Sequence, residues 1–355
     1  MPQKTTIKEI AKKAGVSIGT VDRVIHNRGR VSDETRQKIL EILQKTDYRA
    51  NLHASALSIR HRCKILVVLP SSQPGGYWWS VWSGIRKALK EHNDLKLDVH
   101  FLMYSQFDAY SCREIFAGIP AQKPDAVIIG TIFVTETRLL CQRLSQENIP
   151  YFFVDSVIRD THPVAAFSVD QHACGMLAAR LLHTMTFGEG KYLLMESSRA
   201  GNQWSLNSLA RQEGFMDYFR SCGLEEFVEV ATFSHNDPQA NDAVISQSLS
   251  SGRHLLGAVV MNSRGGVVAE MFQKFSARHI ALVAFDATDQ NLQHLREGGI
   301  DALLCQRPVM QGYQVTIAAI RYIVYREKPE RTVHHLPIDI LLKENMDSYK
   351  EIIIA

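Results

Sequence analysis

The chain has 355 residues, of which 45% are hydrophobic and 22% are charged, with a formal net charge of +3 at pH 7. This composition is typical of a globular protein with two or three folding units, and it excludes collagen-like, disordered and membrane-embedded classes. The charge is unevenly distributed, because residues 1–62 hold 13 Lys/Arg and 6 Asp/Glu, a net charge of +7, whereas the remainder has a net charge of −4. A basic segment ahead of a mildly acidic body predicts a polyanionic partner for that segment.

The distribution of cysteines and apolar residues predicts a cytoplasmic protein. The six cysteines form no Cys-x-x-Cys pair and have no histidine at ligand spacing, which favours small buried side chains in a reducing compartment over disulfides or a metal site. The N-terminus has no apolar segment of the kind found in signal peptides. The longest uncharged run, residues 65–85, contains a Pro- and Gly-rich loop and is therefore not expected to span a membrane. We expect no metal and no cofactor.

Two short helices joined by a tight turn are predicted near the N-terminus. Thr6 and Glu9 have the spacing of a capping box at the start of the first helix, and Gly15 ends its apolar stripe. Ser17 is then expected to cap a second helix over residues 18–25. A helix-turn-helix unit of this kind inserts its second helix into the major groove of DNA.

A third helix is predicted to begin at Ser32. Its expected core face consists of four apolar residues, Ile39, Leu40, Ile42 and Leu43. The alternative is that the three small helices only form a structural core and that their Lys and Arg side chains are simply solvated at the surface. The net charge of +7 over residues 1–62 favours DNA binding over that alternative.

Five blocks of residues follow one another within this segment. They are Thr6-Ile7-Lys8-Glu9-Ile10-Ala11, Ala14-Gly15-Val16-Ser17, Thr20-Val21-Asp22-Arg23-Val24, Val31-Ser32-Asp33-Glu34-Thr35-Arg36 and Tyr48-Arg49-Ala50-Asn51. Together they resemble the headpiece of the LacI/GalR family of bacterial transcriptional regulators. The resemblance implies that the following residues contact DNA: Thr6, Ser17, Ile18, Gly19, Thr20, Arg23 and Asn27. Arg23 is expected to read a guanine, because a guanidinium can bond to O6 and N7 together.

Residues 51–62 resemble the hinge helix and linker of that family. Leu57 matches the leucine that the family inserts into the minor groove, and Ala54 matches a small residue at which two hinge helices touch. An exposed linker residue is the alternative interpretation of Leu57. The family usually has Pro in place of Ala50 and Ser in place of Asp22. These departures predict a looser hinge and a carboxylate that lies near phosphates or selects a cytosine.

From Lys64 onward, short apolar runs alternate with longer amphipathic stretches. The runs are Ile65–Leu69, Leu97–Met103, Ala126–Ile129, Tyr151–Val154, Tyr192–Met195, Val228–Phe233, Ala258–Met261, Ala281–Phe285 and Ala302–Leu304. Continuous apolar runs predict strands that are buried on both faces, and therefore a parallel α/β body. The number of strands is too large for one compact sheet, so we expect two lobes.

The body contains no sequence motif of a common enzyme class. Gly-x-Gly-x-x-Gly, Gly-x-Ser-x-Gly and His-Glu-x-x-His motifs are absent, and residues 188–192 do not match a P-loop. The body instead resembles the type I periplasmic sugar-binding fold of LacI/GalR regulators. The resemblance implies a helix-turn-helix headpiece over 1–50, a hinge over 51–62, a two-lobed effector and dimerisation domain over 63–345 and a tail over 346–355. The expected lobe crossovers lie near 160–168, 305–309 and 330–340.

The resemblance also implies a ligand site at the ends of the strands, where open α/β sheets bind ligands. The matching residues are Tyr77, Trp78, Trp79, Asp155, Trp204, Arg211, Asn262, Asp286 and Gln306. Aromatic planes bury the C–H faces of pyranoses, and carboxylates, amides and an arginine can bind adjacent hydroxyls. The polar residues could instead cap following helices, and Trp79 and Trp204 could be structural. Gly75 and Gly76 replace the Asn-Pro that is common in sugar binders, which predicts a more open pocket mouth.

These patterns together predict a transcriptional regulator, not an enzyme. We expect a homodimer that binds double-stranded operator DNA and a small polyhydroxylated effector, which would be a monosaccharide, a sugar acid or a cyclitol. No membrane partner is expected. The alternative is a free sugar-binding receptor, but neither the basic N-terminal segment nor the absence of an apolar leader favours it.

Overall fold

The computed structural model describes residues 7–25, 29–45, 62–198, 205–234, 237–250 and 252–349. Two compact units can be distinguished, of which the first contains the N-terminal helices and the second contains both β-sheets. Within the described residues, no helix is long and apolar enough to cross a membrane. Five of the six cysteines are buried as free thiols, whereas Cys222 is exposed.

The N-terminal unit begins with three helices, α1 (Ile7–Ala14), α2 (Ile18–Ile25) and α3 (Asp33–Lys45). Gly15 permits the turn between α1 and α2, because its φ of +74° lies in the left-handed region. The Ser17 hydroxyl accepts a hydrogen bond from the Thr20 N–H at 3.1 Å and so caps α2. Thr6, the expected cap of α1, lies outside the described residues.

The three helices enclose a small apolar core. Ile10, Val21 and Ile39 have no exposed surface, and Ile42 and Leu43 pack against this core. Leu40 differs from the prediction, since 46% of it is exposed. Adjacent residues of a helix point about 100° apart, and with Ile39 at the centre of the core face, Leu40 points toward solvent.

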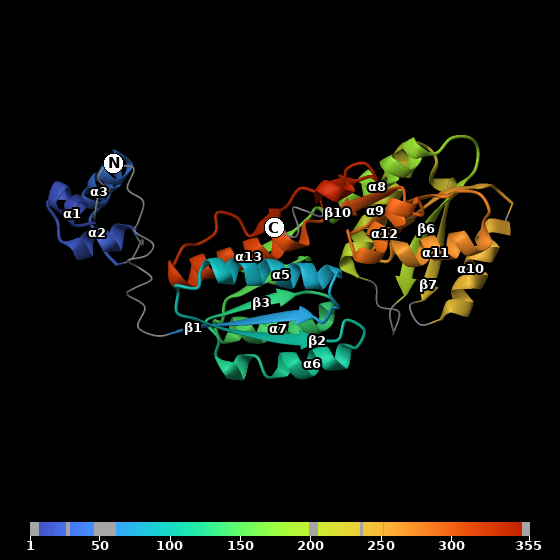
Figure 1. The fold of residues 1–355 in the computed structure, drawn as a ribbon. Helices are drawn as coiled ribbons and strands as arrows, with labels where there is room; N and C mark the ends of the chain where they lie inside the picture. The colour runs from blue at the N-terminus through green and yellow to red at the C-terminus, as the bar shows by residue number, and fades with distance from the viewer. Residues whose placement is uncertain are drawn as a thin grey trace. The chain divides into compact units, whose positions relative to one another are not determined.

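The N-terminal lobe of the body is built on a parallel six-stranded sheet with the order β11-β5-β4-β3-β1-β2. Its strands are β1 (Cys63–Pro70), β2 (Leu97–Tyr104), β3 (Ala126–Gly130), β4 (Tyr151–Val154), β5 (Ala165–Ser168) and β11 (Val333–His335). The helices of this lobe are α5 (Tyr77–Glu91), α6 (Ala109–Ala117), α7 (Val134–Gln146) and α13 (Pro308–Val324), which packs on α5, with a 3-10 turn at Pro120–Gln122. Figure 1 shows α5 on one face of the sheet and α6 on the other.

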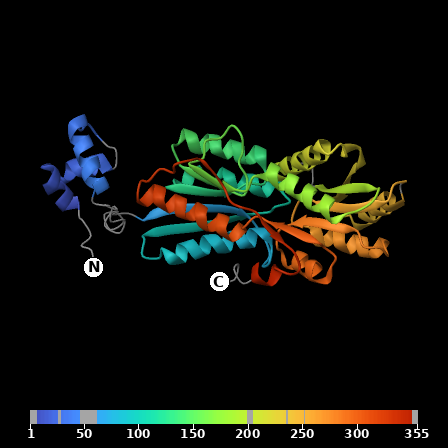
Figure 2. The same cartoon turned by 90° about the horizontal axis from the view of Figure 1, so that it is seen from above.

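The C-terminal lobe contains a second six-stranded sheet with the order β12-β10-β9-β8-β6-β7, and only its β12 is antiparallel to its neighbour. Its strands are β6 (Lys191–Ser198), β7 (Val228–Ser234), β8 (Leu255–Val260), β9 (Ala281–Phe285), β10 (Ala302–Cys305) and β12 (Asp339–Leu341). Its helices are α8 (Gln171–Met185), α9 (Leu206–Ser221), α10 (Pro238–Ser250), α11 (Gly265–Phe275) and α12 (Asp289–Glu297), with a 3-10 turn at Glu225–Phe227. The two sheets lie beside each other in Figure 2.

The inner strands β1, β3, β4, β8, β9 and β10 are buried on both faces, as their continuous apolar runs predicted, whereas the edge strands β2 and β7 are partly exposed. In β6, Leu193 and Met195 pack with α10, α11 and α12, whereas Tyr192 and Leu194 pack with α8 and α9. This alternation follows from the two-residue period of a strand. The prediction of a two-lobed, mostly parallel α/β body is therefore confirmed. The short strands β5, β11 and β12 were not predicted.

Helices α8 and α9 cross at unusually short range in the C-terminal lobe. A Cβ on Gly175 would lie 1.9 Å from the carbonyl oxygen of Arg211, and a Cβ on Gly214 would lie 2.0 Å from that of His172. Only glycine at both positions permits this distance between the helices. The crossing therefore sets the position of Arg211 on α9.

Candidate functional site

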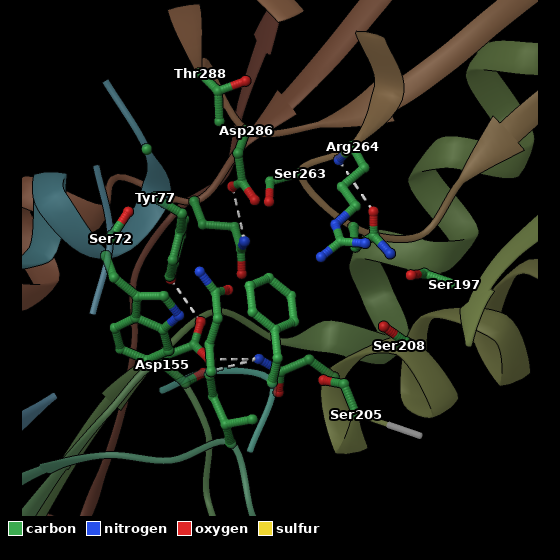
Figure 3. Close-up of a pocket in the computed structure, with 18 of the residues that line it drawn as sticks. Ser72, Tyr77, Asp155, Ser197, Ser205, Ser208, Ser263, Arg264, Asp286 and Thr288 are labelled. Carbon is green, nitrogen blue, oxygen red and sulfur yellow. Dashed lines mark hydrogen bonds between the residues drawn. The ribbon is translucent and has the colours of Figure 1, made fainter. Parts of the chain in front are cut away.

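A cavity of about 320 Å³ lies between the two lobes, at the carboxyl ends of strands from both sheets. Figure 3 shows its side chains converging from both lobes. Seven of the predicted ligand residues line it, namely Tyr77, Trp78, Asp155, Arg211, Asn262, Asp286 and Gln306. Trp204 lies outside the described residues.

Trp79 was predicted as a ligand contact but does not line the cavity. The preceding residue, Trp78, faces inward and is only 6% exposed, so the next side chain on α5 must point elsewhere. Trp79 is 37% exposed and stacks on Trp82, with ring centroids 4.6 Å apart.

Asp155 and Asp286 occupy equivalent positions in the two lobes. Asp155 follows β4 and Asp286 follows β9, and their φ angles of +81° and +69° lie in the left-handed region. Such a backbone is unfavourable for residues other than glycine and tends to persist at functional sites. The two carboxylates are thus directed into the cavity at a conformational cost.

The carboxylate of Asp155 is held by donors from both lobes. The Tyr77 hydroxyl donates to Oδ1 at 2.5 Å, and Asn207 of the C-terminal lobe donates from Nδ2 to Oδ2 at 2.9 Å. The Ser156 hydroxyl also donates to Oδ2, at 3.1 Å. Burial, followed by the charge of Asp155, raises the pKa of Tyr77 well above its ordinary value. Tyr77 therefore remains a hydrogen-bond donor at any physiological pH.

The Arg211 guanidinium is buried and is engaged by uncharged acceptors. Nε donates to Gln171 at 2.7 Å, Nη1 to the carbonyl oxygen of Met261 at 2.8 Å and Nη2 to Gln306 at 2.7 Å. Its Cζ lies 4.1 Å from the ring centroid of Phe285. Three of its five N–H donors thus connect α9 to α8, to the residue after β8 and to the residue after β10.

Asp286 is fully enclosed beside this arginine. Its Oδ1 accepts a hydrogen bond from Nε2 of Gln306 at 2.8 Å, and Oδ2 makes no hydrogen bond within the described part of the chain. Burial raises the pKa of Asp286 to about 6, against the opposing effects of the Arg211 charge and the Gln306 hydrogen bond. Asp286 consequently presents an acceptor oxygen to the cavity at neutral pH.

The predicted base-reading residues lie on the exposed part of α2. Ile18 is 52% exposed although it is apolar, and Gly19 and Arg23 are also exposed. An exposed isoleucine at the start of a recognition helix is available to base edges in the major groove. The other proposed DNA contacts, Asn27, Ala54 and Leu57, lie outside the described residues, as does Thr6.

Comparison with known families identifies both parts of the chain. Residues 6–51 match the family "Bacterial regulatory proteins, lacI family", and residues 65–327 match the family "Periplasmic binding protein domain". The chain belongs to the periplasmic binding protein domain family, and its N-terminal segment has the helix-turn-helix of the lacI family of bacterial regulatory proteins. The expected resemblance is therefore confirmed.

Relatives of this chain include DegA of Bacillus subtilis, an HTH-type transcriptional regulator that is 32% identical over 188 residues, 52% of this chain and 53% of DegA. Catabolite control protein A of Staphylococcus aureus is 24% identical over 250 residues, 68% of this chain and 72% of the relative. The match therefore spans about half of the length of DegA. DegA is a regulator, which agrees with the prediction that the chain is not an enzyme.

Solved structures with the same fold cover most of the chain. A protein from Bacteroides fragilis described as a LacI transcriptional regulator has a TM-score of 0.76 at 23% identity, covering 81% of this chain and 99% of that one. GanP of Geobacillus stearothermophilus, a glucose-galactose binding protein, has a TM-score of 0.68 at 20% identity, covering 80% and 99% of the two chains. At these identities the similarity establishes the fold alone.

Several residues in or beside the cavity were not predicted. Asn207 lies four residues before Arg211 and so shares its helix face, a spacing that could have indicated it. Gln311 does not line the cavity but supports two residues that do, because it accepts from the N–H of Asp155 at 3.1 Å and donates to the carbonyl oxygen of Gln306 at 2.8 Å. No local pattern marks Gln311, because its partners are distant in sequence or contact it through their backbone. Within the described residues, no group of His, Cys, Asp and Glu side chains could hold a metal ion.

The departure at Gly75 and Gly76 has a structural explanation. Gly75 has a φ of +80°, and a Cβ there would lie 2.2 Å from Oδ2 of Asp289 in the C-terminal lobe. Its carbonyl oxygen accepts a hydrogen bond from the Asp289 N–H at 3.3 Å. A side chain at position 75 would be strained at this φ and would displace the Asp289 carboxylate, so glycine suits this contact between the lobes.

The raised pKa of Asp286 predicts a pH-dependent cost to folding. The pKa of this carboxyl is higher in the folded chain than the ordinary value of 3.8. Its protonation therefore contributes fully to stability below about pH 3.8, and this contribution is lost as the pH rises through about 6. Relative to Asp286→Asn, the ligand-free wild type should lose about 3 kcal/mol between about pH 4 and about pH 7. Urea unfolding of both proteins across this range measures the difference. A pH-independent difference would show that Asp286 titrates normally.

Proposed function

We propose that this chain is a sequence-specific transcriptional regulator that acts in the cytoplasm as a homodimer. Its affinity for operator DNA would be controlled by a small polyhydroxylated ligand, which would be a monosaccharide, a sugar acid or a cyclitol. The observation that carries the proposal is the combination of a basic helix-turn-helix unit with a two-lobed cavity that contains Asp155, Asp286 and Trp78. Carboxylate oxygens accept hydrogen bonds from adjacent hydroxyls, and an indole packs against a sugar ring.

Control of DNA binding would follow from changes in the contact between the lobes. Asn207 of the C-terminal lobe already bonds to Asp155 of the N-terminal lobe, so a ligand in the cavity must either add to this contact or displace it. Either outcome changes the free energy of lobe closure. A coupling of about 1–3 kcal/mol between the ligand site and the DNA site is typical of such systems.

The proposed homodimer has a suitable apolar surface on the N-terminal lobe. Trp79 stacks on Trp82, which in turn contacts Phe101 of β2 with ring centroids 6.3 Å apart. β2 is an edge strand, and its Met103 is 40% exposed. Exposed apolar side chains such as Trp79 and Met103, on and beside an edge strand, favour burial against a second copy. Sedimentation of the purified protein would measure the oligomeric state.

A DNA-shift assay with and without sugars tests this function. Operator sequences can be selected from a random duplex library with the full chain, and the shift is then repeated with panels of sugars, sugar acids and cyclitols. We expect selection of a palindrome and a ligand-dependent change in its affinity. Sugar binding without any selected DNA sequence would favour the receptor alternative.

Replacing Arg23 by alanine should reduce both operator affinity and specificity. The loss of a bidentate guanine contact should cost about 1–3 kcal/mol on the operator and little on random DNA. Lys38→Ala, which removes the same charge from an exposed position on α3, is the matched control. Titrations at several salt concentrations measure both affinities. If Arg23→Ala weakens operator and random DNA equally, Arg23 contacts only phosphate.

A further inference from the structure

The ligand cavity has chemically different ends. On one side, Asp155 follows β4 and Asp286 follows β9. The other side contains Phe107, which follows the edge strand β2, Ser197, which lies in β6, and Arg264, which follows β8. Figure 3 shows the same separation, with Asp155 and Tyr77 on one side and Arg264, Ser197 and Ser208 on the other. We call the second region the outer end.

The outer end is lined by hydrogen-bond donors. The Arg264 guanidinium lies 5.2 Å from the ring centroid of Phe107, so a residue of the N-terminal lobe holds it over the cavity. Four serines line the cavity from the C-terminal lobe: Ser197, Ser205, Ser208 and Ser263. Within the described part of the chain, their hydroxyls make no hydrogen bond. In contrast, the carboxylate of Asp155 at the other end already accepts three hydrogen bonds.

Two further features of the outer end favour an anion. Helix α9 starts at Leu206 and presents Asn207 and Ser208, from its first turn, to the cavity, where the helix dipole attracts negative charge. Arg264 brings a positive charge to this end of the cavity, whereas Arg211 lies beside Asp286 and donates to Gln171, Met261 and Gln306. A group with several acceptor oxygens could accept hydrogen bonds from the guanidinium and the serines together.

We propose that the effector is a phosphorylated sugar or polyol, with its phosphate at the outer end and its hydroxyls at Asp155 and Asp286. A phosphate monoester carries a charge of about −1.5 to −2 and three acceptor oxygens, whereas a carboxylate has only two oxygens for the same donors. The cavity of about 320 Å³ lies within the ordinary size range of small-molecule sites. This inference rests on the proposed function and specifies the ligand class of the same site.

Calorimetry on the full chain tests the inference with matched pairs of ligands. The probes are glucose, gluconate and glucose 6-phosphate, ribose and ribose 5-phosphate, and inositol and inositol 1-phosphate, with inorganic phosphate as a competitor. At least one phosphorylated member should bind about tenfold or more tightly than its unphosphorylated partner. Arg264→Gln should weaken the phosphorylated ligand by about ten- to hundredfold and its partner by less than about threefold. Arg253→Gln is the matched control, because Arg253 also lies over a ring, that of Phe227, but away from the cavity.

The outcomes separate this inference from the proposed function. If an unphosphorylated sugar or a sugar acid binds as tightly as any phosphate and alters operator affinity, the function stands and the phosphate assignment is wrong. An equal loss for both ligand types in Arg264→Gln would also overturn the assignment. If no ligand of the panel binds to a protein that still selects an operator, ligand control and the phosphate assignment both fail.

Discussion

Replacing Asp286 by asparagine should weaken effector binding by about a hundredfold. The carboxylate is buried, and its Oδ2 is left for a ligand hydroxyl after Gln306 has bonded to Oδ1. An asparagine of nearly the same size offers one acceptor in place of two, and its amide donors would face the ligand hydroxyls or Gln306. Calorimetry with the tightest-binding member of the sugar and sugar-phosphate panel measures the loss.

The specificity of this effect can be checked with a surface aspartate of the same lobe. Asp242 on α10 pairs with Lys274 of α11, and Asp242→Asn should leave effector affinity unchanged. Operator affinity without effector reports whether the Asp286 variant has kept its fold. Wild-type effector affinity in a folded Asp286→Asn protein would place the ligand site elsewhere.

A single methyl group at Gly214 should destabilise the body by about 3 kcal/mol. The added Cβ would lie 2.0 Å from the carbonyl oxygen of His172, which belongs to the backbone of α8 and cannot rotate away. Helices α8 and α9 must then separate, and the guanidinium of Arg211, one turn earlier on α9, moves with them. Effector binding should therefore weaken together with stability, as measured by urea unfolding and calorimetry.

Gly118→Ala provides the control for this experiment. Gly118 follows α6 with a φ of −86°, and the nearest atom to an added Cβ is the carbonyl oxygen of Ile115 at 3.9 Å. The change should alter the free energy of unfolding by less than about 0.5 kcal/mol. Equal stability of both variants would show that the α8–α9 crossing relaxes at little cost.

The sequence alone was sufficient for the fold class and for much of the candidate site. Continuous apolar runs such as Tyr151–Val154 indicate strands buried on both faces, because only such strands can bury every side chain. Polar residues that directly follow these runs, including Asp155 and Asp286, must lie at the carboxyl edge of a sheet. Residue spacing likewise indicated the helices on either side of Gly15. These features depend on local periodicity, which can be recognised from consecutive residues.

Only the tertiary structure showed which side chains meet across the cavity. Trp78 and Trp79 are equivalent in sequence, and their different roles follow from the orientation of α5 on its sheet. The contact of Asn207 with Asp155 and that of Arg264 with Phe107 join residues of different lobes. Such pairs have no fixed spacing along the chain, because their separation depends on how two independently folded sheets pack. Local periodicity therefore determined the elements and their edges, whereas the packing of the two lobes decided the chemistry between them.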